Sequence, residues 1–189
     1  AFAFSGRAGL KRSVTRRMFG RHEPDQEQRA IPDYRRYRVP GGCYFFTVNL
    51  LERRGNTMLT DRIDLLRDAV RRVGRTRPFS IDAWIVLPDH LHAVWTLPPG
   101  DDDFSTRWRL IKTFFARGLP KAERLSRVRR ADGERGIWQR RFWEHAIRNE
   151  GDYAAHMDYV HFNPVKHGLV ASPADWPYST FRSCVSRGL

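Results

Sequence analysis

Two runs of β-branched and aromatic residues, separated by one Pro-Asp step, constrain the fold of this chain most strongly. FSIDAWIVL follows Pro78, HLHAVWTL ends before Pro98, and Pro88-Asp89 lies between the two runs. Runs of this composition that are bounded by turn residues are typical of strands, and so short a connection predicts an antiparallel hairpin. A further run, CYFFTVNLL, predicts a buried strand. The chain is therefore expected to contain a sheet.

Three segments have apolar residues at helical spacing. Each carries a start or stop signal, which is a side chain that caps the first turn or a glycine or proline at the end. Pro164 is expected to terminate the last of these helices, because proline disfavours helical geometry at the residue before it. The expected limits are Thr60 or Asp61 to Gly74, residues 101–103 to Gly118 or Pro120, and Asn149 to Pro164.

The remaining segments are less regular. Residues 121–137 are charged and lack an apolar face, so we expect a loop, and WQRRFWEHAIR is interpreted as a short strand or turn. Strand, helix, hairpin, helix and then mixed elements indicate an α+β domain rather than a doubly wound one. A chain of 189 residues has room for one such domain, expected over 33–189, and a tail.

The chain is strongly basic, with 34 Lys and Arg against 21 Asp and Glu and a formal net charge of +13. Residues 1–32 hold seven basic and three acidic side chains without periodicity, which predicts a basic, largely disordered arm. Most of the excess lies in residues 107–148, where thirteen basic side chains accompany four acidic ones. A charge concentrated in this way predicts a polyanionic partner.

Aromatic residues are interleaved with these charges. Arginine beside exposed ring surface is a composition that grips phosphates and stacks bases. The alternative is that the rings belong to the core and the arginines are merely solvated. We expect the aromatic residues of the helix to be core, and Arg140, Arg141 and Arg148 to be the better candidates for phosphate contact. The aromatic residues concerned are Trp108, Phe114, Phe115, Trp138, Phe142 and Trp143.

The cysteines and the apolar runs bear on the compartment. Cys43 and Cys184 allow one disulfide at most and lack the paired spacing of a zinc site, which favours a reducing compartment. No apolar run approaches the roughly 18 residues that a membrane span needs, and the first residues lack the ordered regions of a signal peptide. We therefore expect a cytoplasmic protein without a membrane segment.

The tripeptide His90-Leu91-His92 lies inside a predicted strand. Side chains at i and i+2 of a strand point to the same face, so both imidazoles are expected on one side and Leu91 in the core beneath. Two neutral imidazoles side by side form a clamp for a divalent metal. The alternative interpretation is a pair of half-exposed strand histidines that bind nothing.

The last predicted helix carries a polar stripe. His156, Tyr159 and Asn163 follow i, i+3 and i+7 spacing, and Asp152 precedes His156 by one turn. Tyr159 alone is equally consistent with an amphipathic surface tyrosine. The residues suited to burial on another side of the helix are Tyr153, Met157 and Val160, while His161 and His167 are interpreted as solvated or hydrogen-bonded histidines.

Four stretches together resemble the REP-associated tyrosine transposases: GGCYFFTVNLLERR, IDAWIVLPDHLHAVWTLPPGDDDFSTRWRLIKTFFAR, RGIWQRRFWEHAIRNEGDYAAHMDYVHFNPVKHGLV and DWPYSTF. The likeness runs from about Arg38 to Phe181, so the basic arm lies outside it. This family is part of a wider group of single-tyrosine transposases that carry a His-hydrophobe-His metal motif. The resemblance implies a ferredoxin-like antiparallel sheet with helices on one face and a nucleophilic tyrosine on a helix beside it.

The resemblance also implies roles for particular residues. By motif, His90 and His92 take metal-ligand positions, Tyr159 takes the nucleophile position, and Asn163 takes that of a third ligand. The wider group usually has glutamine there. Asparagine is shorter by one methylene, so His156 or a water is an alternative third ligand. The implied metal is Mg²⁺ or Mn²⁺, which supplies the charge that a phenol of pKa about 10 needs to attack a phosphodiester at neutral pH.

The implied activity is that of a single-stranded DNA endonuclease and strand transferase, which acts at REP hairpins through a 5′-phosphotyrosine intermediate. We expect single-stranded and hairpin DNA as partners, and a nucleoid-associated monomer or homodimer. Two alternatives stay open: a non-catalytic hairpin-binding protein, and a hydrolase that uses His90 and His92 with an activated water. The side chains expected to contact DNA are Arg107, Lys112, Arg140, Arg141, Arg148 and Lys166.

Overall fold

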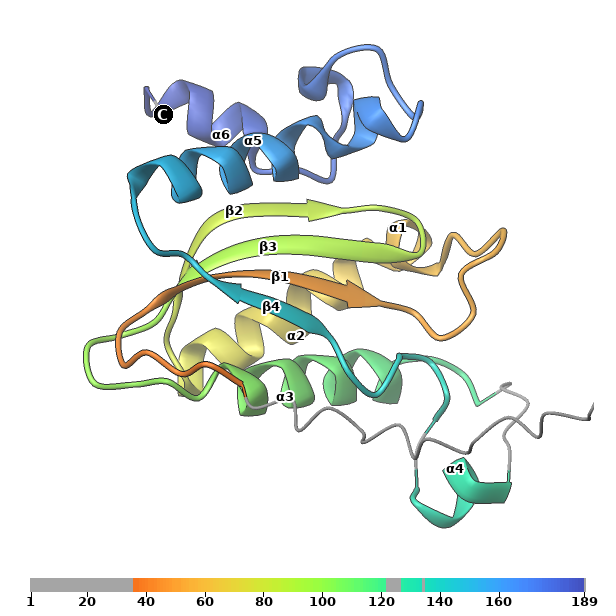
Figure 1. Cartoon of the computed structure of the whole chain (residues 1–189). Helices are drawn as coiled ribbons and strands as arrows, with labels where there is room; N and C mark the ends of the chain where they lie inside the picture. The colour runs from red at the N-terminus through yellow and green to blue at the C-terminus, as the bar shows by residue number, and fades with distance from the viewer. Residues whose placement is uncertain (1–35, 122–126, 134, 189) are drawn as a thin grey trace, which may run out of the picture. The chain divides into compact units, whose positions relative to one another are not determined.

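A computed structural model describes residues 36–121, 127–133 and 135–188 of the protein. The arm expected at 1–32 lies outside these residues. The strands are β1 (Cys43–Asn49), β2 (Ser80–Val86), β3 (His90–Thr96) and β4 (Trp143–Ala146). They form one antiparallel sheet in the order β2-β3-β1-β4. The strand β4 is therefore an edge strand beside β1 (Figure 1).

The helices lie between these strands and after the last of them. They are α1 (Met58–Asp61), α2 (Ile63–Thr76), α3 (Phe104–Arg117), α4 (Arg127–Ala131), α5 (Glu150–Lys166) and α6 (Phe181–Ser186), with a 3₁₀ turn η1 (Pro173–Asp175). The core elements follow the order β1, α2, β2, β3, α3, β4. This βαββαβ order, together with the sheet order, is that of a ferredoxin-like fold. The predicted α+β class with an antiparallel sheet is thereby confirmed.

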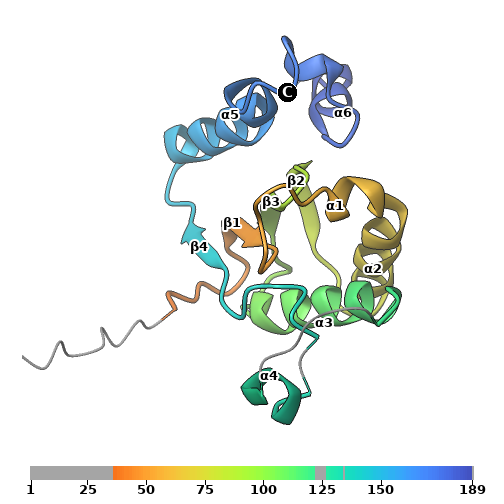
Figure 2. The same ribbon diagram turned by 90° about the vertical axis from the view of Figure 1, so that its right-hand side faces the viewer.

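Both faces of the sheet are apolar, and each is covered by helices. The first face packs on α2 and α3, where the rings of Trp95 and Trp108 stack 4.2 Å apart in the main core. The second face carries Phe45, Ile85 and Val94 and packs against α5. Helices on one face were expected; α2 and α3 meet that expectation, whereas α5 lies on the opposite face (Figure 2). A second apolar face needs such a cover, because strands expose alternate residues on each side.

Several local predictions are confirmed. The strands β2 and β3 form a hairpin, in which the N–H of Leu87 donates to the carbonyl of His90 at 2.8 Å. Asp103 caps α3 and Asn149 caps α5, each by accepting a backbone N–H from the first turn. The segment interpreted as a strand or turn contains β4. Local capping chemistry was therefore sufficient to place the starts of these two helices.

Other helix limits were predicted wrongly. The helix expected to start at Thr60 or Asp61 and end at Gly74 is α2, which starts at Ile63 and runs to Thr76. Glycine ends a helix readily when it takes a left-handed conformation, and Gly74 does not take one. The loop expected over 121–137 contains the short helix α4.

Pro164 does not terminate α5, which continues to Lys166. Proline removes one backbone donor but leaves the later N–H groups able to bond, and the N–H of His167 donates to the carbonyl of Asn163 at 3.0 Å. Asn163 and Pro164 are both buried, so packing favours the continued helix. The two residues beyond Pro164 include Lys166, and His167 follows directly at the end of the helix.

The structure bears on two features from which the compartment was inferred, the cysteines and the absence of a membrane span. Cys43 and Cys184 both carry free thiols. Burial raises the pKa of the Cys43 thiol to about 11, which keeps it protonated and unreactive at neutral pH. None of the helices in the described part of the chain is long and apolar enough to cross a membrane.

Candidate active site and nucleic-acid interface

His90 and His92 lie next to one another on the α5 side of β3. Their ring centroids are 5.0 Å apart, and both side chains are buried. Leu91 points into the opposite core, as strand alternation predicts. Each imidazole is held through Nδ1: that of His90 donates to the Asp89 carboxylate at 2.6 Å, and that of His92 is hydrogen-bonded to the Thr47 hydroxyl at 2.9 Å. This leaves Nε2 of both rings for another partner.

Burial keeps both imidazoles neutral. Desolvation lowers the pKa of His92 to about 3 and also lowers the pKa of His90. Asp89 is itself held by Arg53, at 2.6 Å, so its carboxylate is fixed where it orients His90. Neutral imidazoles oriented by a carboxylate and a hydroxyl are in the state that metal ligation requires.

Tyr159 lies beside this pair, on α5. Its ring centroid is 5.2 Å from that of His92 and 5.6 Å from that of Phe45. The side chain is 41% exposed, so its hydroxyl is accessible to a large substrate. The ammonium of Lys166 lies 5.2 Å from the centre of the same ring. A phenol, a cation and two neutral imidazoles therefore lie close together on the α5 side of the sheet.

Asn163 lies one turn after Tyr159 on α5 and is almost fully buried. Within the described part of the chain, neither Oδ1 nor Nδ2 of Asn163 has a hydrogen-bond partner, and Nε2 of His92 has none either. Unpaired buried polar atoms are costly, and a group that binds them accounts for their being kept. One amide oxygen and two imidazole nitrogens make a donor set that suits Mn²⁺ and is acceptable to Mg²⁺. The residues present therefore fit a divalent cation.

His167, interpreted from the sequence as a solvated or hydrogen-bonded histidine, is exposed. It directly follows α5, and its ring centroid is 5.4 Å from that of His90. Tyr159, Asn163 and His167 are spaced by four residues, and the first and last of them contact His92 and His90.

His156, considered as an alternative third ligand, lies in another cluster. It contacts His145 and Asp152, and the Phe45 ring contacts both His156 (4.8 Å) and His92 (5.5 Å). His161 is buried and hydrogen-bonded to the Thr180 hydroxyl at 3.1 Å, so it is one of the hydrogen-bonded histidines that the sequence predicted.

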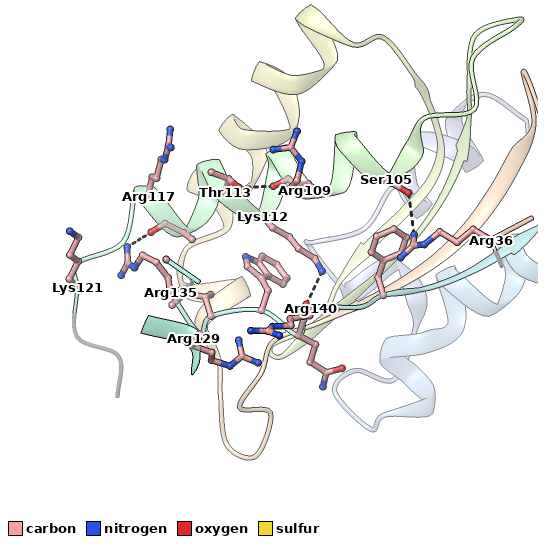
Figure 3. Close-up of a pocket in the computed structure, with 17 residues that line it drawn as sticks. Arg36, Ser105, Arg109, Lys112, Thr113, Arg117, Lys121, Arg129, Arg135 and Arg140 are labelled. Atoms are coloured by element: carbon pink, nitrogen blue, oxygen red, sulfur yellow. Dashed lines mark hydrogen bonds between the residues drawn. The ribbon is translucent and has the colours of Figure 1, made fainter. Parts of the chain in front are cut away.

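A basic groove lies on the α3 side of the sheet (Figure 3). We use this name for the cavity of about 890 Å³ between α3, α4 and the chain that leads into β4. No acidic side chain is among the described residues that line it. Lys112 reaches into it and donates to the carbonyl of Gln139 at 2.9 Å, and burial lowers the pKa of Lys112 to about 8. Its basic lining residues are Arg36, Arg109, Lys112, Arg117, Lys121, Arg129, Arg135 and Arg140.

Three further arginines expected to contact DNA lie in or near the segment that leads into β4 and out of it. Arg140 lines the basic groove and pairs with Asp132 at 2.5 Å. Arg141 and Arg148 are exposed on either side of β4. The aromatic side chains of α3 are core, as expected for Trp108 and Phe115. Trp143 on β4 is instead 51% exposed and packs edge-on against Phe45.

Arg107 was expected to contact DNA, and this expectation is wrong. The side chain is 1% exposed and pairs with both carboxylate oxygens of Asp101, at 2.6 and 3.1 Å. It also donates to the carbonyls of Arg77, Pro78 and Asp103. The guanidinium holds the pKa of Asp101 below its usual range. Arg107 therefore ties the start of α3 to the end of α2 and cannot reach a ligand.

Replacing Arg107 with methionine is expected to lower the free energy of unfolding by about 3 kcal/mol, because three carbonyls and one carboxylate lose their buried partner. Chemical denaturation measures this difference. Arg109→Met, an exposed change on the same helix, is the matched control and is expected to cost no more than about 0.5 kcal/mol. Equal effects of the two substitutions would contradict the structural role of Arg107.

No model of a known protein family matches the chain. A REP-associated tyrosine transposase of Escherichia coli (strain K12) is 54% identical over 159 residues, which cover 84% of this chain and 88% of that protein. A Haemophilus influenzae protein named for the same family is 46% identical over 152 residues, which cover 80% of this chain and 86% of that protein.

Among solved structures, that of a REP-associated tyrosine transposase bound to a REP hairpin is similar, with a TM-score of 0.71 and 53% identity. The match covers 83% of this chain and 87% of that one. On this similarity of sequence and fold, the chain belongs to the family of REP-associated tyrosine transposases.

Proposed function

We propose that the chain cleaves and rejoins single-stranded DNA beside a REP hairpin, with Tyr159 as the nucleophile. In the proposed step Oη of Tyr159 attacks the scissile phosphorus, the bond from phosphorus to the 3′-oxygen breaks, and the phenolic proton is passed to solvent or the leaving 3′-oxygen. The product is a 5′-phosphotyrosine and a free 3′-hydroxyl. A later 3′-hydroxyl reverses the step, so strand transfer needs no nucleotide cofactor. The observation that carries this proposal is the exposed Tyr159 ring 5.2 Å from His92.

His90 and His92, through Nε2, and Asn163, through Oδ1, are the residues that would hold the divalent cation. When bound, Mg²⁺ or Mn²⁺ supplies a Lewis acid that polarises the scissile phosphate. Asp89 and Thr47 hold the two imidazoles in orientation, and the Asp89 carboxylate, which can only accept, also sets the tautomer of His90. Lys166 lies against the Tyr159 ring, where its charge favours the approach of a phosphate.

The basic groove is the proposed site for the duplex stem of the hairpin. The solved relative is described as bound to a REP hairpin. In this chain the groove lies on the α3 side of the sheet and the paired histidines on the α5 side. The edge strand β4 follows directly from the groove, and its exposed Trp143 contacts Phe45, which in turn contacts Tyr159. The proposed path of the reacting strand therefore runs around β4, where Trp143 offers a surface for stacking.

An end-labelled hairpin substrate tests the proposed polarity. We expect that a hairpin with a single-stranded extension, incubated with the protein and Mn²⁺, gives a protein–DNA adduct that survives denaturation. A label at the 3′ end of the substrate is expected to remain with the protein, and a label at the 5′ end to be released. Transfer of the 5′ label would overturn the proposed linkage. Hairpin binding without any adduct would favour the non-catalytic alternative.

Removing charge from the basic groove is expected to weaken hairpin binding and its salt dependence. Arg109→Ala combined with Arg117→Ala should lower the slope of log K against log[salt] by about 2, because two phosphate contacts are lost. Arg62→Ala combined with Arg75→Ala removes the same charge from the N-cap of α2 and from its last turn, outside the groove, and is the matched control. Fluorescence anisotropy over a salt series measures both slopes. A slope equally changed in both variants would show that the groove has no special part in binding.

A further inference from the structure

A second cluster of possible metal ligands joins β4 to α5. His145 is on β4, and Asp152 and His156 are one turn apart on α5. Nε2 of His145 lies 2.9 Å from a carboxylate oxygen of Asp152, and Nδ1 of His156 lies 3.1 Å from the other. The two imidazole rings stack at 4.7 Å, with an angle of 17° between their planes. We call these three residues the β4–α5 cluster.

The cluster has the composition and spacing of a transition-metal site. One ligand atom from each residue lies within 4.8 Å of the other two, so a small closing movement brings all three to a shared ion. Two imidazole nitrogens and one carboxylate oxygen suit Zn²⁺, Co²⁺ or Ni²⁺ much better than Mg²⁺. Each side chain is about one fifth exposed, so an ion can enter and keep a water on its open side.

Asp152 is already arranged as a ligand would be. Its carboxylate accepts the backbone N–H of Arg148 at 2.9 Å, which holds it at the start of α5. The hydrogen bond from His145 is the main cause that keeps the pKa of Asp152 below its usual range, so the group is ionised at neutral pH. The i, i+4 spacing of Asp152 and His156 places both on one side of the helix.

We propose that the β4–α5 cluster binds a zinc-class divalent ion, at a site separate from His90 and His92. The ion would fasten the edge strand to the first turns of the helix that carries Tyr159. Tyr159 follows His156 by three residues, and the ring of Phe45 contacts both side chains. A bound ion therefore acts as a positioning device for the tyrosine helix. Metal binding is measured without DNA, so its outcome does not depend on the proposed nuclease activity.

Titration with Co²⁺ tests this site, because Co²⁺ takes zinc-type ligands and absorbs visible light when they bind it. The full chain is used without a histidine tag. The double variant His90→Ala, His92→Ala removes the other pair and is expected to retain one tightly bound Co²⁺ that Zn²⁺ displaces. Adding Asp152→Asn or His156→Gln to that background is expected to remove the ion. Asparagine still accepts the Arg148 N–H, so this variant tests charge and ligation rather than the fold.

Thermal melting provides the second measurement. Zn²⁺ is expected to raise the melting temperature of the His90→Ala, His92→Ala protein and to leave that of the triple variants unchanged, since only an ion bound to the folded state stabilises it. The competing explanation is that His145 and His156 simply hydrogen-bond to Asp152. Absence of Co²⁺ binding in the double variant, or binding that survives both further substitutions, would overturn the proposal in favour of that explanation.

Discussion

Tyr159→Phe is expected to eliminate the covalent protein–DNA adduct and to lower strand cleavage by about 10³-fold or more, the scale seen when a covalent catalyst loses its nucleophile. Phenylalanine keeps the ring that contacts Phe45, His92 and Lys166, so the surface around it is preserved. Hairpin affinity is therefore expected to stay unchanged. Denaturing gels measure the adduct, single-turnover assays measure cleavage, and anisotropy measures binding.

Tyr153→Phe is the matched control for this substitution. Tyr153 is also on α5, but it packs against the second apolar cluster around Phe45 and Val160. Its phenylalanine variant is expected to form the adduct at the wild-type rate. Cleavage that continues in Tyr159→Phe would point instead to an activated water and to the hydrolase alternative.

His92→Ala and His90→Ala are expected to reduce cleavage by at least about 10²-fold, because each removes a ligand of the proposed cation. Hairpin affinity should fall little, since the basic groove lies on the other side of the sheet. A Mn²⁺ titration of single-turnover cleavage distinguishes ligand loss from general damage, and circular dichroism checks the fold. Equal losses of cleavage and of hairpin binding would contradict the metal assignment.

The residues behind the imidazoles sharpen this test. Thr47→Val and Asp89→Asn are expected to raise the Mn²⁺ concentration for half-maximal cleavage by about 10-fold or more, with most of the maximal rate retained. His161→Gln changes a histidine on α5 that bonds to Thr180, and it should leave the Mn²⁺ dependence as it is. A uniform loss of rate in all three variants, without a shift in Mn²⁺ dependence, would count against the positioning role of Thr47 and Asp89.

The sequence was most informative where a single element determines the geometry. Strand alternation is enough to place His90 and His92 on one face with Leu91 on the other. Helical spacing is enough to put Tyr159 and Asn163 on one side of α5. Neither pattern contains the strand register, and it is the pairing of Thr47 with His92 across β1 and β3 that positions the hydroxyl beside the imidazole.

The errors arose where distant contacts decide the outcome. Arg107 was grouped with neighbouring arginines by charge alone. In the fold it is buried, and its guanidinium pairs with Asp101 and donates to a carbonyl at the end of α2. His156 was offered as an alternative third ligand, and the structure stacks its ring on that of His145 on β4 at 4.7 Å. No local pattern identifies the strand that lies there.

The edge strand β4 lies between the basic groove and the proposed site of cleavage. We propose that the stem is held in the basic groove, before β4, and that the bond is broken on the α5 side of the sheet. The residues that bind the stem and those that break the bond then belong to different segments of the chain. The groove residues would then set where the stem lies, while His90 and His92 on β3 and Tyr159 on α5 act on the scissile bond. A substitution on the surface of the groove would then change hairpin affinity without changing the rate of the chemical step.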